Sequence, residues 1–442
     1  MQQGQNIPRK PSRRELLPAA ALLGGLLHAA ESDAGAKSAV LSDEATAVIK
    51  EVAARNPKPS RPTGKGVTGI DDADNIRIHL RECPLVIEAC RKQKLHKIEF
   101  RGNLTWAHES LLKLSSLDIG VTGGPRELDP WVAAVNAWID GFKDAGFTGV
   151  DINSGLYPWN SDDKTAVSKS QKAIERIRRD GLRLALNPEI NPWAAGKQPD
   201  FEAYTRECVK GWSMLARRFQ PMVLMVTHEI ATMQYRLGFA PSIPQWTEYL
   251  KRTAAAVKEA SPNTLVGVGF VPGTFALDLE YARKLATLPE MDLISVDIYD
   301  LRGFDRTDAV VRMAKAAGKR VFIEETWRAV YWPPEMETTL KGAEGLWDGG
   351  GVALEKYQPI DALWMEMVAV YAAAWGMDAV VPFWTQTLFK YLPTDDWHAG
   401  LVYSKLYNAA IEKALVNGER TKTFYACKKL IQELGKTRAQ LA

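Results

Sequence analysis

The sequence predicts an α/β fold, a (β/α)8 TIM barrel with an N-terminal extension. From about residue 95 onward, short β-branched or apolar runs alternate with longer amphipathic segments, which is the pattern of parallel βα units. No GxGxxG turn follows the first run, so a closed barrel is better supported than an open dinucleotide-binding sheet. The candidate strands are 97–100, 147–152, 182–187, 222–229, 264–271, 292–299, 320–325 and 379–384.

Amphipathic helices are predicted between these strands. Several of them end at a glycine directly before the next strand, where a left-handed stop is expected: Gly146, Gly181, Gly318 and Gly376. The helical segments are 131–146, 166–181, 201–219, 246–260, 279–288, 309–318 and 362–376. A barrel of this kind places its functional groups in the loops that follow the carboxyl ends of the strands.

Length and composition define the parts of the chain. Its 442 residues suffice for one such barrel with insertions. With 46% apolar and 25% charged residues it has the balance of a soluble globular protein, which excludes a multi-spanning membrane protein. We expect a signal peptide over 1–36, an N-terminal extension and linker over 37–90, and the barrel with a C-terminal helix over 91–442.

The first segment has the three parts of an export signal. Arg13 and Arg14 precede an apolar stretch over 18–30, and a small-residue end follows. This stretch is too short to span a bilayer, and no cysteine follows it for lipid attachment. The sequence Ser-Arg-Arg-Glu-Leu-Leu over 12–17 resembles the twin-arginine motif. The precursor is therefore expected to use the twin-arginine export machinery, and the mature protein to be periplasmic or secreted without a stable membrane anchor.

The second segment carries no chemistry that its sequence indicates. Residues 42–56 have a helical pattern with Ser42 as its N-cap, and the Pro/Gly-rich residues 57–66 form a connector.

Charge and cysteine content exclude several classes of function. The net charge is +3 with both signs interspersed, so nucleic acid is not an expected partner. The sequence has no CxxC, HxH or HExxH motif, which disfavours a zinc site. Cys83 and Cys90, seven positions apart, would lie about 10 Å apart on one helix, beyond disulfide reach. No metal and no cofactor are predicted.

Acidic residues close two of the predicted strands. Glu229 ends the fourth, and Glu324 and Glu325 end the seventh, which faces the fourth across the barrel mouth. A charged carboxylate among buried groups is costly without a partner. Retaining glycoside cleavage uses two carboxyl groups about 5–5.5 Å apart, one as nucleophile and one as acid/base. The acid must hold its proton near neutral pH, which desolvation or a second carboxylate allows.

This pattern resembles the clan A retaining glycoside hydrolases, a TIM-barrel group that includes cellulases, mannanases and endo-β-1,4-galactanases. The resemblance covers about 95–400 and is strongest at four strand ends. It implies Glu229 as the catalytic acid/base and Glu325 as the nucleophile, because Glu325-Thr326-Trp327 resembles the turn of galactanase-like members. Glu324 is the alternative nucleophile. Neighbours on a strand face opposite sides, so only one of the two is expected in the site.

The resemblance also implies substrate contacts. Tyr299 matches the tyrosine that hydrogen-bonds the nucleophile, and Trp384 matches the tryptophan beneath the catalytic subsite. His228 stands where the family has an asparagine that contacts the sugar 2-hydroxyl.

Tryptophan supports a sugar-binding face. Half of the fourteen tryptophans follow predicted strands, and such flat, amphipathic rings suit stacking on sugar C–H faces. These are Trp106, Trp159, Trp193, Trp327, Trp332, Trp384 and Trp397. The full set of predicted substrate-binding residues is His228, Tyr299, Trp384, Trp327, Arg101, Asn187, Trp193 and Trp159.

The resulting hypothesis is an exported enzyme of polysaccharide degradation, a retaining glycoside hydrolase that cleaves a β-linked poly- or oligosaccharide. Two alternatives remain. One is a barrel that only binds glycans, which the histidine at 228 favours. The other is a metal-dependent hydrolase with hard-cation ligands drawn from Asp151, Glu189, Glu229 and Asp297. The sugar, the linkage, endo or exo action and the oligomeric state are not predicted.

Overall fold

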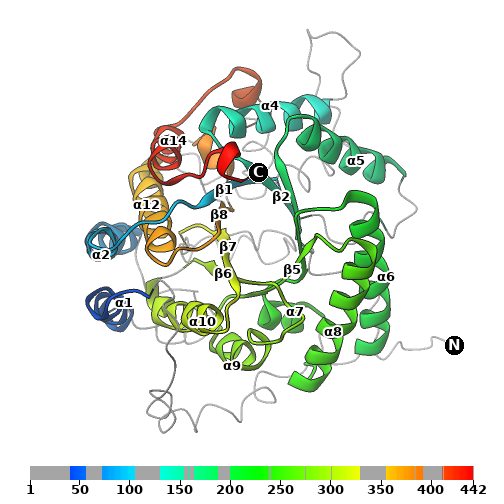
Figure 1. The fold of residues 1–442 in the computed structure, drawn as a ribbon. Helices are drawn as coiled ribbons and strands as arrows, with labels where there is room; N and C mark the ends of the chain where they lie inside the picture. Colours follow the sequence, from blue (N-terminus) through cyan, green and yellow to red (C-terminus); the bar gives the residue numbers. More distant parts are fainter. Residues whose placement is uncertain are drawn as a thin grey trace, which may run out of the picture.

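The computed structural model contains a closed barrel of eight parallel strands in the order β1 to β8, surrounded by helices (Figure 1). This confirms the predicted fold class. The structure describes residues 40–55, 72–104, 130–153, 159, 164–187, 200–237, 240–273, 275–299, 301–328, 355–383, 385–391, 411 and 413–441. The predicted signal peptide over 1–36 therefore lies outside the described residues.

Each predicted strand corresponds to an observed one, with boundaries that differ by a few residues. The strands are β1 (Glu99–Asn103), β2 (Gly149–Asn153), β3 (Arg183–Asn187), β4 (Val223–Thr227), β5 (Leu265–Phe270), β6 (Leu293–Ile298), β7 (Arg320–Thr326) and β8 (Ala379–Pro382). β1 pairs with β8 as well as with β2, which closes the barrel.

The helices form the outer layer. They are α1 (Asp43–Arg55), α2 (Asp72–Arg91), α4 (Pro130–Ala145), α5 (Lys164–Arg179), α6 (Phe201–Phe219), α7 (Ile230–Leu237), α8 (Ile243–Ala260), α9 (Ala276–Leu285), α10 (Phe304–Ala316), α12 (Gln358–Ala374) and α14 (Lys422–Leu434). The four predicted glycine stops all have positive φ. The sequence did not indicate α7, a short helix that begins directly after Glu229.

Helices α1 and α2 precede the barrel and pack on its outer layer. Ser42 caps α1 as predicted, because the backbone N–H of Ala45 donates to its Oγ at 3.2 Å. α1 contacts α10 and α2 contacts α12, side by side in Figure 1. Their apolar residues, such as Ile49 and Val86, belong to the same hydrophobic cluster as the barrel strands.

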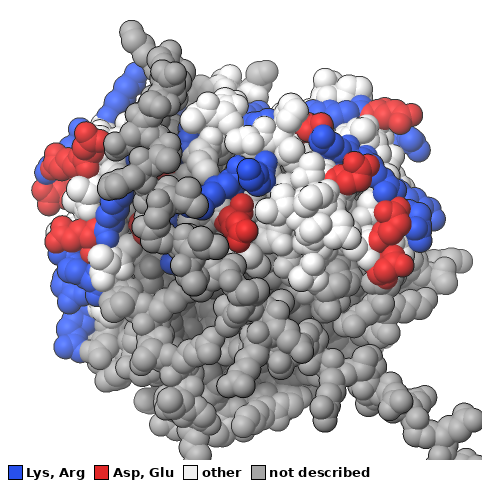
Figure 2. Space-filling view, turned by 90° about the horizontal axis from the view of Figure 1, so that it is seen from below, with Lys and Arg blue, Asp and Glu red and all other residues white. Residues whose placement is uncertain are grey.

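Charge on the surface is mixed. Figure 2 shows basic and acidic side chains next to one another on the face that it draws. No helix within the described ranges has the length and apolar character needed to cross a membrane.

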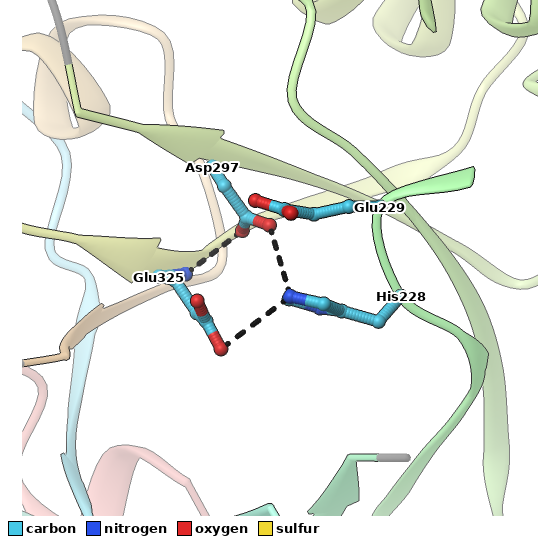
Figure 3. A group of neighbouring side chains, drawn as sticks. All are labelled: His228, Glu229, Asp297 and Glu325. Carbon is cyan, nitrogen blue, oxygen red and sulfur yellow. Dashed lines mark hydrogen bonds and ion pairs between the residues drawn. The ribbon is translucent and has the colours of Figure 1, made fainter. Parts of the chain in front are cut away.

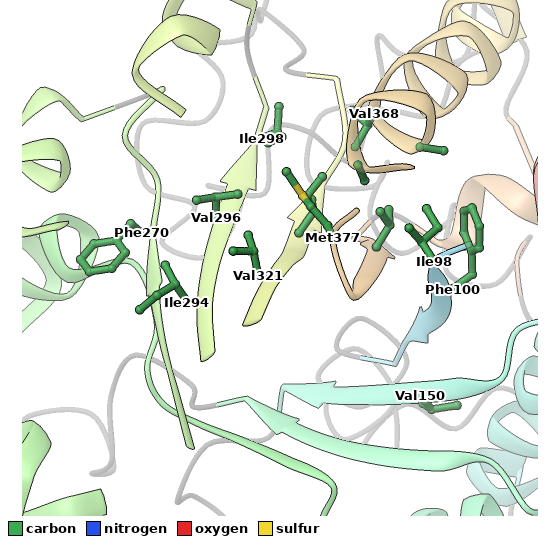
Figure 4. Packing of buried hydrophobic residues seen from close by; sticks show 14 of the residues in the cluster. Ile98, Phe100, Val150, Phe270, Ile294, Val296, Ile298, Val321, Val368 and Met377 are labelled. Carbon is green, nitrogen blue, oxygen red and sulfur yellow. The ribbon is translucent and has the colours of Figure 1, made fainter. Parts of the chain in front are cut away.

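Two apolar layers hold the strands. The larger lies between the strands and the helices and includes Phe270, Ile294, Val296 and Val321 (Figure 4). The smaller fills the lower part of the barrel interior with Ala185, Val223, Met225, Leu293, Phe322 and Ala379. Gly267 of β5 makes room for it, since a Cβ there would overlap the Met225 sulfur.

Charged side chains also occupy the barrel interior, in two groups. The lower charge cluster is Glu99, Arg101, Asp151 and Arg183, near the amino ends of β1 and β3. The upper charge cluster is His228, Glu229, Asp297, Glu324 and Glu325, near the carboxyl ends of β4, β6 and β7. The candidate site is the upper charge cluster, because barrels of this kind carry their chemistry at that end.

Candidate active site

Strand β7 carries both candidate nucleophiles, and its register is irregular where they occur. Val296 of β6 pairs with Ile323, but the next residue, Asp297, pairs with Glu325. Two steps along β7 therefore match one step along β6, which is the pattern of a β-bulge. A bulge interrupts the alternation of side chains between the two faces of a strand.

Both glutamates consequently face the barrel interior. Glu324 Oε2 lies 4.0 Å from His228 Nδ1, and Glu325 Oε1 lies 3.5 Å from His228 Nε2. The prediction that only one of the two enters the site was wrong. It assumed a regular strand, whereas the bulge turns consecutive residues toward the same imidazole.

Four side chains meet at the barrel mouth. Ligand atoms of His228, Glu229, Asp297 and Glu325 all lie within 4.8 Å of one another (Figure 3). His228 and Glu229 come from the end of β4, Asp297 from β6 and Glu325 from β7. Three of the four are buried, while Glu229 is partly exposed. The structure thus brings the two predicted catalytic residues together.

Strand β6 and Tyr299, the residue that directly follows it, hold Glu325 from two sides. The Tyr299 hydroxyl donates a hydrogen bond to Glu325 Oε2, the contact that the resemblance implied. The backbone N–H of Glu325 donates to Asp297 Oδ1 at 3.0 Å. The carboxyl end of β6 therefore sets the backbone position of Glu325 through Asp297 and its carboxylate orientation through Tyr299.

Glu324 lies deeper and binds a different partner. The Ser295 hydroxyl donates to Glu324 Oε2 at 2.5 Å. A Cβ at Gly269 of β5 would lie 2.8 Å from Ser295 Oγ and 3.2 Å from Glu324 Oε2, so a glycine leaves the space that this pair needs. Neither Ser295 nor Gly269 carried a signal in the sequence, because their importance follows from what packs against them.

Burial makes ionisation unfavourable for the deeper groups. The pKa of Glu324 is raised to about 8, chiefly by burial, and the charges of Asp151 and Glu229 add to this while the Ser295 hydrogen bond opposes it. The pKa of Asp297 is raised well above its usual value by burial and then by the charges of Glu325, Glu229 and Glu324. Burial and the neighbouring carboxylates therefore favour the protonated form of Asp297.

A further carboxyl group holds the turn that carries Glu229. Asp278 of α9 is fully buried, and its two oxygens accept from the backbone N–H groups of Ala231 at 2.9 Å and Val271 at 2.7 Å. It therefore ties the start of α7 to the end of β5. Burial, partly offset by these hydrogen bonds, raises its pKa to about 7. Sequence reasoning missed Asp278, which sits in an ordinary helical pattern.

The remaining predicted substrate contacts divide into three groups. Asn187 lies at the carboxyl end of β3 and is buried, and its Oδ1 has no hydrogen-bond partner among the described residues. This position matches the expectation for a residue of the barrel mouth. Trp384 and Trp193 lie outside the described residues, as do Trp106, Trp332 and Trp397.

Arg101 does not fit its predicted role. It is fully buried in the lower charge cluster, where its guanidinium lies 3.1 Å from Glu99 and 3.6 Å from Asp151. Its ring contact is with Phe322 inside the barrel. The prediction treated β1 as ending at residue 100, whereas the strand continues to Asn103 and points Arg101 inward.

Two tryptophans were also misplaced by the sequence. Trp159 packs in the helix layer, with its ring centroid 4.9 Å from that of Phe219 and the Arg218 guanidinium 5.2 Å away. Trp327 is 1% exposed and packs with Met365 of α12 and Leu430 of α14. Trp327 is buried, and Trp159, although partly exposed, lies against the carboxyl end of α6, so both are corrected to packing residues.

The ligand set of the metal-dependent alternative is not assembled as predicted. Asp151 belongs to the lower charge cluster, and Glu189 lies outside the described residues. Glu229 and Asp297 do meet, but with His228 and Glu325 as their neighbours.

Comparisons with known proteins bear on the fold. No family model matches the chain, and no curated protein matches it. Solved structures similar to it include GH5_18 from Streptomyces cattleya in complex with GlcNAc, with a TM-score of 0.47 and 13% identity over 77% of this chain and 81% of that chain. A psychrophilic glycoside hydrolase family 10 endo-β-1,4-xylanase has a TM-score of 0.46 and 11% identity over 77% of this chain and 98% of that chain.

A third similar structure is a GH5 xyloglucan-specific β-1,4-glucanase from a ruminal metagenomic library, with a TM-score of 0.44 and 12% identity over 79% of this chain and 97% of that chain. At such low identity these matches concern the fold alone.

Proposed function

We propose that this chain is a retaining glycoside hydrolase that acts on a β-linked poly- or oligosaccharide, with Glu229 as acid/base and Glu325 as nucleophile. The observation that carries the proposal is the closeness of these two carboxyl groups, since one oxygen of Glu229 lies within 4.8 Å of one oxygen of Glu325 at the ends of β4 and β7. Retaining enzymes separate the two groups by about 5–5.5 Å, whereas inverting enzymes need roughly 6.5–9.5 Å to admit a water.

In this proposal Glu325 attacks the anomeric carbon. The Tyr299 hydroxyl donates to Glu325 Oε2, which favours the ionised carboxylate that the attack requires. Burial and the neighbouring carboxylates raise the pKa of Asp297, which disfavours a further negative charge beside Glu325. The hydrogen bond from Tyr299 thus favours ionisation at Glu325 in a cluster where simultaneous ionisation of all carboxyl groups is unfavourable.

Glu229 protonates the leaving glycosidic oxygen as the bond to the anomeric carbon breaks. After the leaving sugar departs, Glu229 takes a proton from water, whose oxygen attacks the glycosyl-enzyme ester and releases Glu325. Its partial exposure suits an exchange of protons with substrate and water. The Asp278 carboxylate, which binds the N–H of Ala231, keeps the Glu229 turn in place.

The decisive experiment is incubation with a panel of β-glycans, with products followed by anomer-resolved NMR. The proposal expects the β-anomer of the new reducing end to form first and then to mutarotate. First formation of the α-anomer would contradict a double displacement. Binding without cleavage across the panel would instead favour the non-catalytic glycan-binding alternative.

The nucleophile is tested by a matched pair of variants on β7. We expect Glu325→Gln to lower kcat by about 10⁴-fold or more while the protein stays folded, because no other group forms the glycosyl-enzyme bond. We expect Glu324→Gln to lower kcat by less than about 10-fold, since Glu324, with a pKa raised to about 8, is mostly neutral at pH 7 and glutamine keeps its shape and hydrogen bonding. The reverse order would assign the nucleophile to Glu324.

Export is proposed on the sequence of residues 1–36 alone. In a bacterial host with a twin-arginine system, the wild-type protein should appear outside the cytoplasm without its first residues. Replacing Arg13 and Arg14 by lysine should retain the full-length precursor inside, which fractionation and intact-mass measurement detect. Unchanged export of that variant would reject the twin-arginine route.

A further inference from the structure

Double displacement needs only two carboxyl groups, but the cluster at the barrel mouth also contains a third carboxyl group and an imidazole that could bind a metal ion. We propose that His228, Glu229, Asp297 and Glu325 form a binding site for a divalent transition-metal ion such as Zn²⁺, and that the ion competes with the sugar for this site. The proposal rests on the proposed function only for its consequence, competition with substrate. Metal binding itself follows from the four side chains.

The distances suit a single small cation. His228 Nε2 lies 3.5 Å from Glu325 Oε1 and 3.7 Å from Asp297 Oδ2, and one ligand atom from each of the four residues lies within 4.8 Å of the others. A tetrahedral zinc ion with bonds of about 2.1 Å holds its ligand atoms about 3.4 Å apart. Small side-chain rotations would therefore complete the coordination.

An independent observation is the second oxygen of Asp297. The side chain is 0% exposed, and its Oδ1 accepts from the Glu325 backbone N–H. Its Oδ2 has no hydrogen-bond partner among the described residues and faces into the cluster, toward His228 (Figure 3). Buried carboxylate oxygens are nearly always paired, so an oxygen left in this position points to a ligand that would bind there.

The donor types select the class of metal. One imidazole nitrogen and up to three carboxylate oxygens suit zinc and neighbouring transition metals, whereas Ca²⁺ takes 6–8 oxygen ligands. The second imidazole nitrogen of His228, Nδ1, faces Glu324 Oε2 at 4.0 Å. Metal-binding histidines typically have a carboxylate on this side, which orients the ring and strengthens it as a ligand.

A metal ion bound at this site would coordinate both proposed catalytic carboxyl groups. An ion bound to Glu325 blocks attack on the anomeric carbon, and an ion bound to Glu229 blocks proton donation. The expected effect is reversible inhibition that a sugar ligand relieves by competition.

The test begins with the metal alone. After dialysis against EDTA and removal of the chelator, isothermal titration of the full chain with ZnCl₂ should show one equivalent of binding. Asp297→Asn and His228→Gln should each weaken Zn²⁺ binding by at least 10-fold, since each removes one ligand. The matched control is Asp151→Asn, the same change at a buried carboxyl of the lower charge cluster, which should keep the affinity.

Circular dichroism identifies any variant that fails to fold. Two ligand variants are made so that the test can still be carried out if only one of them folds. Absence of Zn²⁺ binding, or equal binding in wild type and both ligand variants, would overturn the proposal. Neither result affects the proposed glycosidase, whose activity is measured on the metal-free enzyme.

In the activity assay, Zn²⁺ added to the metal-free enzyme should inhibit competitively and EDTA should restore turnover. A requirement for Zn²⁺ in turnover would overturn both the competition and the double displacement, and would support the metal-dependent alternative.

Discussion

The two charge clusters inside the barrel differ in how their charge is balanced. In the lower cluster, Glu99 lies 3.1 Å from Arg101 and 3.0 Å from Arg183, and Arg101 lies 3.6 Å from Asp151. Two carboxyl groups thus meet two guanidinium groups. In the upper cluster, four carboxyl groups surround one imidazole. No Lys or Arg of the described chain lies within ion-pair distance of its two deepest carboxyl groups, Asp297 and Glu324.

This difference in charge balance indicates that the lower cluster is structural. Burial raises the pKa of Asp151 only to about 6, because the charge of Arg101 opposes it. Burial raises the pKa of Glu324 to about 8, and the charges of Asp151 and Glu229 add to the effect, while the Ser295 hydrogen bond and the charge of Arg101 offset it only in part. A cluster in which positive and negative charges are equal in number stays ionised, and its ion pairs hold the strands together. A cluster with an excess of carboxyl groups keeps some of them protonated, which suits it to acid–base chemistry.

The largest expected effect breaks the balance of the lower cluster. Arg101→Met leaves Glu99 and Asp151 without their shared cation in the barrel interior. We expect the free energy of unfolding to fall by about 3–5 kcal/mol, the usual cost of breaking a buried ion pair. Urea denaturation at pH 7 measures this. A loss below about 1 kcal/mol would mean that Arg183 alone compensates the cluster.

The next effect concerns the pH dependence of stability. The pKa of Glu324 rises from 4.5 to about 8 on folding, so between these pH values the folded state binds a proton that the unfolded state has released. Stability from this group is complete below pH 4.5 and is lost as the pH rises toward 8, by about 1.4 kcal/mol per pH unit.

Glu324→Gln removes this one contribution. From pH 6 to pH 8 we expect the variant to lose about 2–3 kcal/mol less stability than the wild type, as measured by urea denaturation at both values. Asp297 and Asp278 have raised pKa values too and should leave a residual slope of the same sign. Parallel profiles for the two proteins would show that Glu324 does not titrate in this range.

A smaller effect tests how the upper cluster is positioned. The Asp278 carboxylate accepts hydrogen bonds from two backbone N–H groups. In Asp278→Asn the side-chain NH₂ group faces one of these N–H groups, so one hydrogen bond near Glu229 is lost. One such bond is worth about 1–2 kcal/mol, so kcat should fall about 10-fold with little change in KM. The alkaline limb of the pH profile of kcat, which reports loss of the Glu229 proton, should shift as well, because Asp278 interacts with Glu229.

The matched control for this variant is Asp292→Asn. Asp292 Oδ2 also accepts a backbone N–H, that of Val266 at 2.8 Å, but it lies just before β6, at the opposite end of the barrel. Its kcat should equal that of the wild type. Equal losses of kcat in both variants would indicate a general loss of structure rather than positioning of Glu229.

The smallest effect is expected on the surface. Arg91 forms ion pairs with Glu366 at 2.9 Å and Glu433 at 2.6 Å, but all three side chains are about one third exposed. Water screens such pairs, so Arg91→Ala should lower the free energy of unfolding by no more than about 1 kcal/mol. A loss as large as that of Arg101→Met would remove the distinction between balanced buried charge and ordinary surface charge.

The sequence by itself determined the barrel and the strand ends that carry the site. Apolar strand runs, amphipathic helices and glycine stops such as Gly146 are local patterns, and they have the same meaning wherever the segment lies. Glu229 and Glu325 were found for the same reason, because the end of a strand is a local property and parallel strands all end on one face.

Only the tertiary structure decided where individual side chains point. The bulge in β7 depends on its register with β6 and turns both Glu324 and Glu325 inward. The packing of Trp159 and Trp327 depends on helices distant in sequence, which supply Phe219, Met365 and Leu430. The charge partners of Arg101 likewise follow from barrel closure. A sequence pattern shows the hydrophobic period of one segment. The burial and the pairing of its side chains depend on the other segments that pack against it.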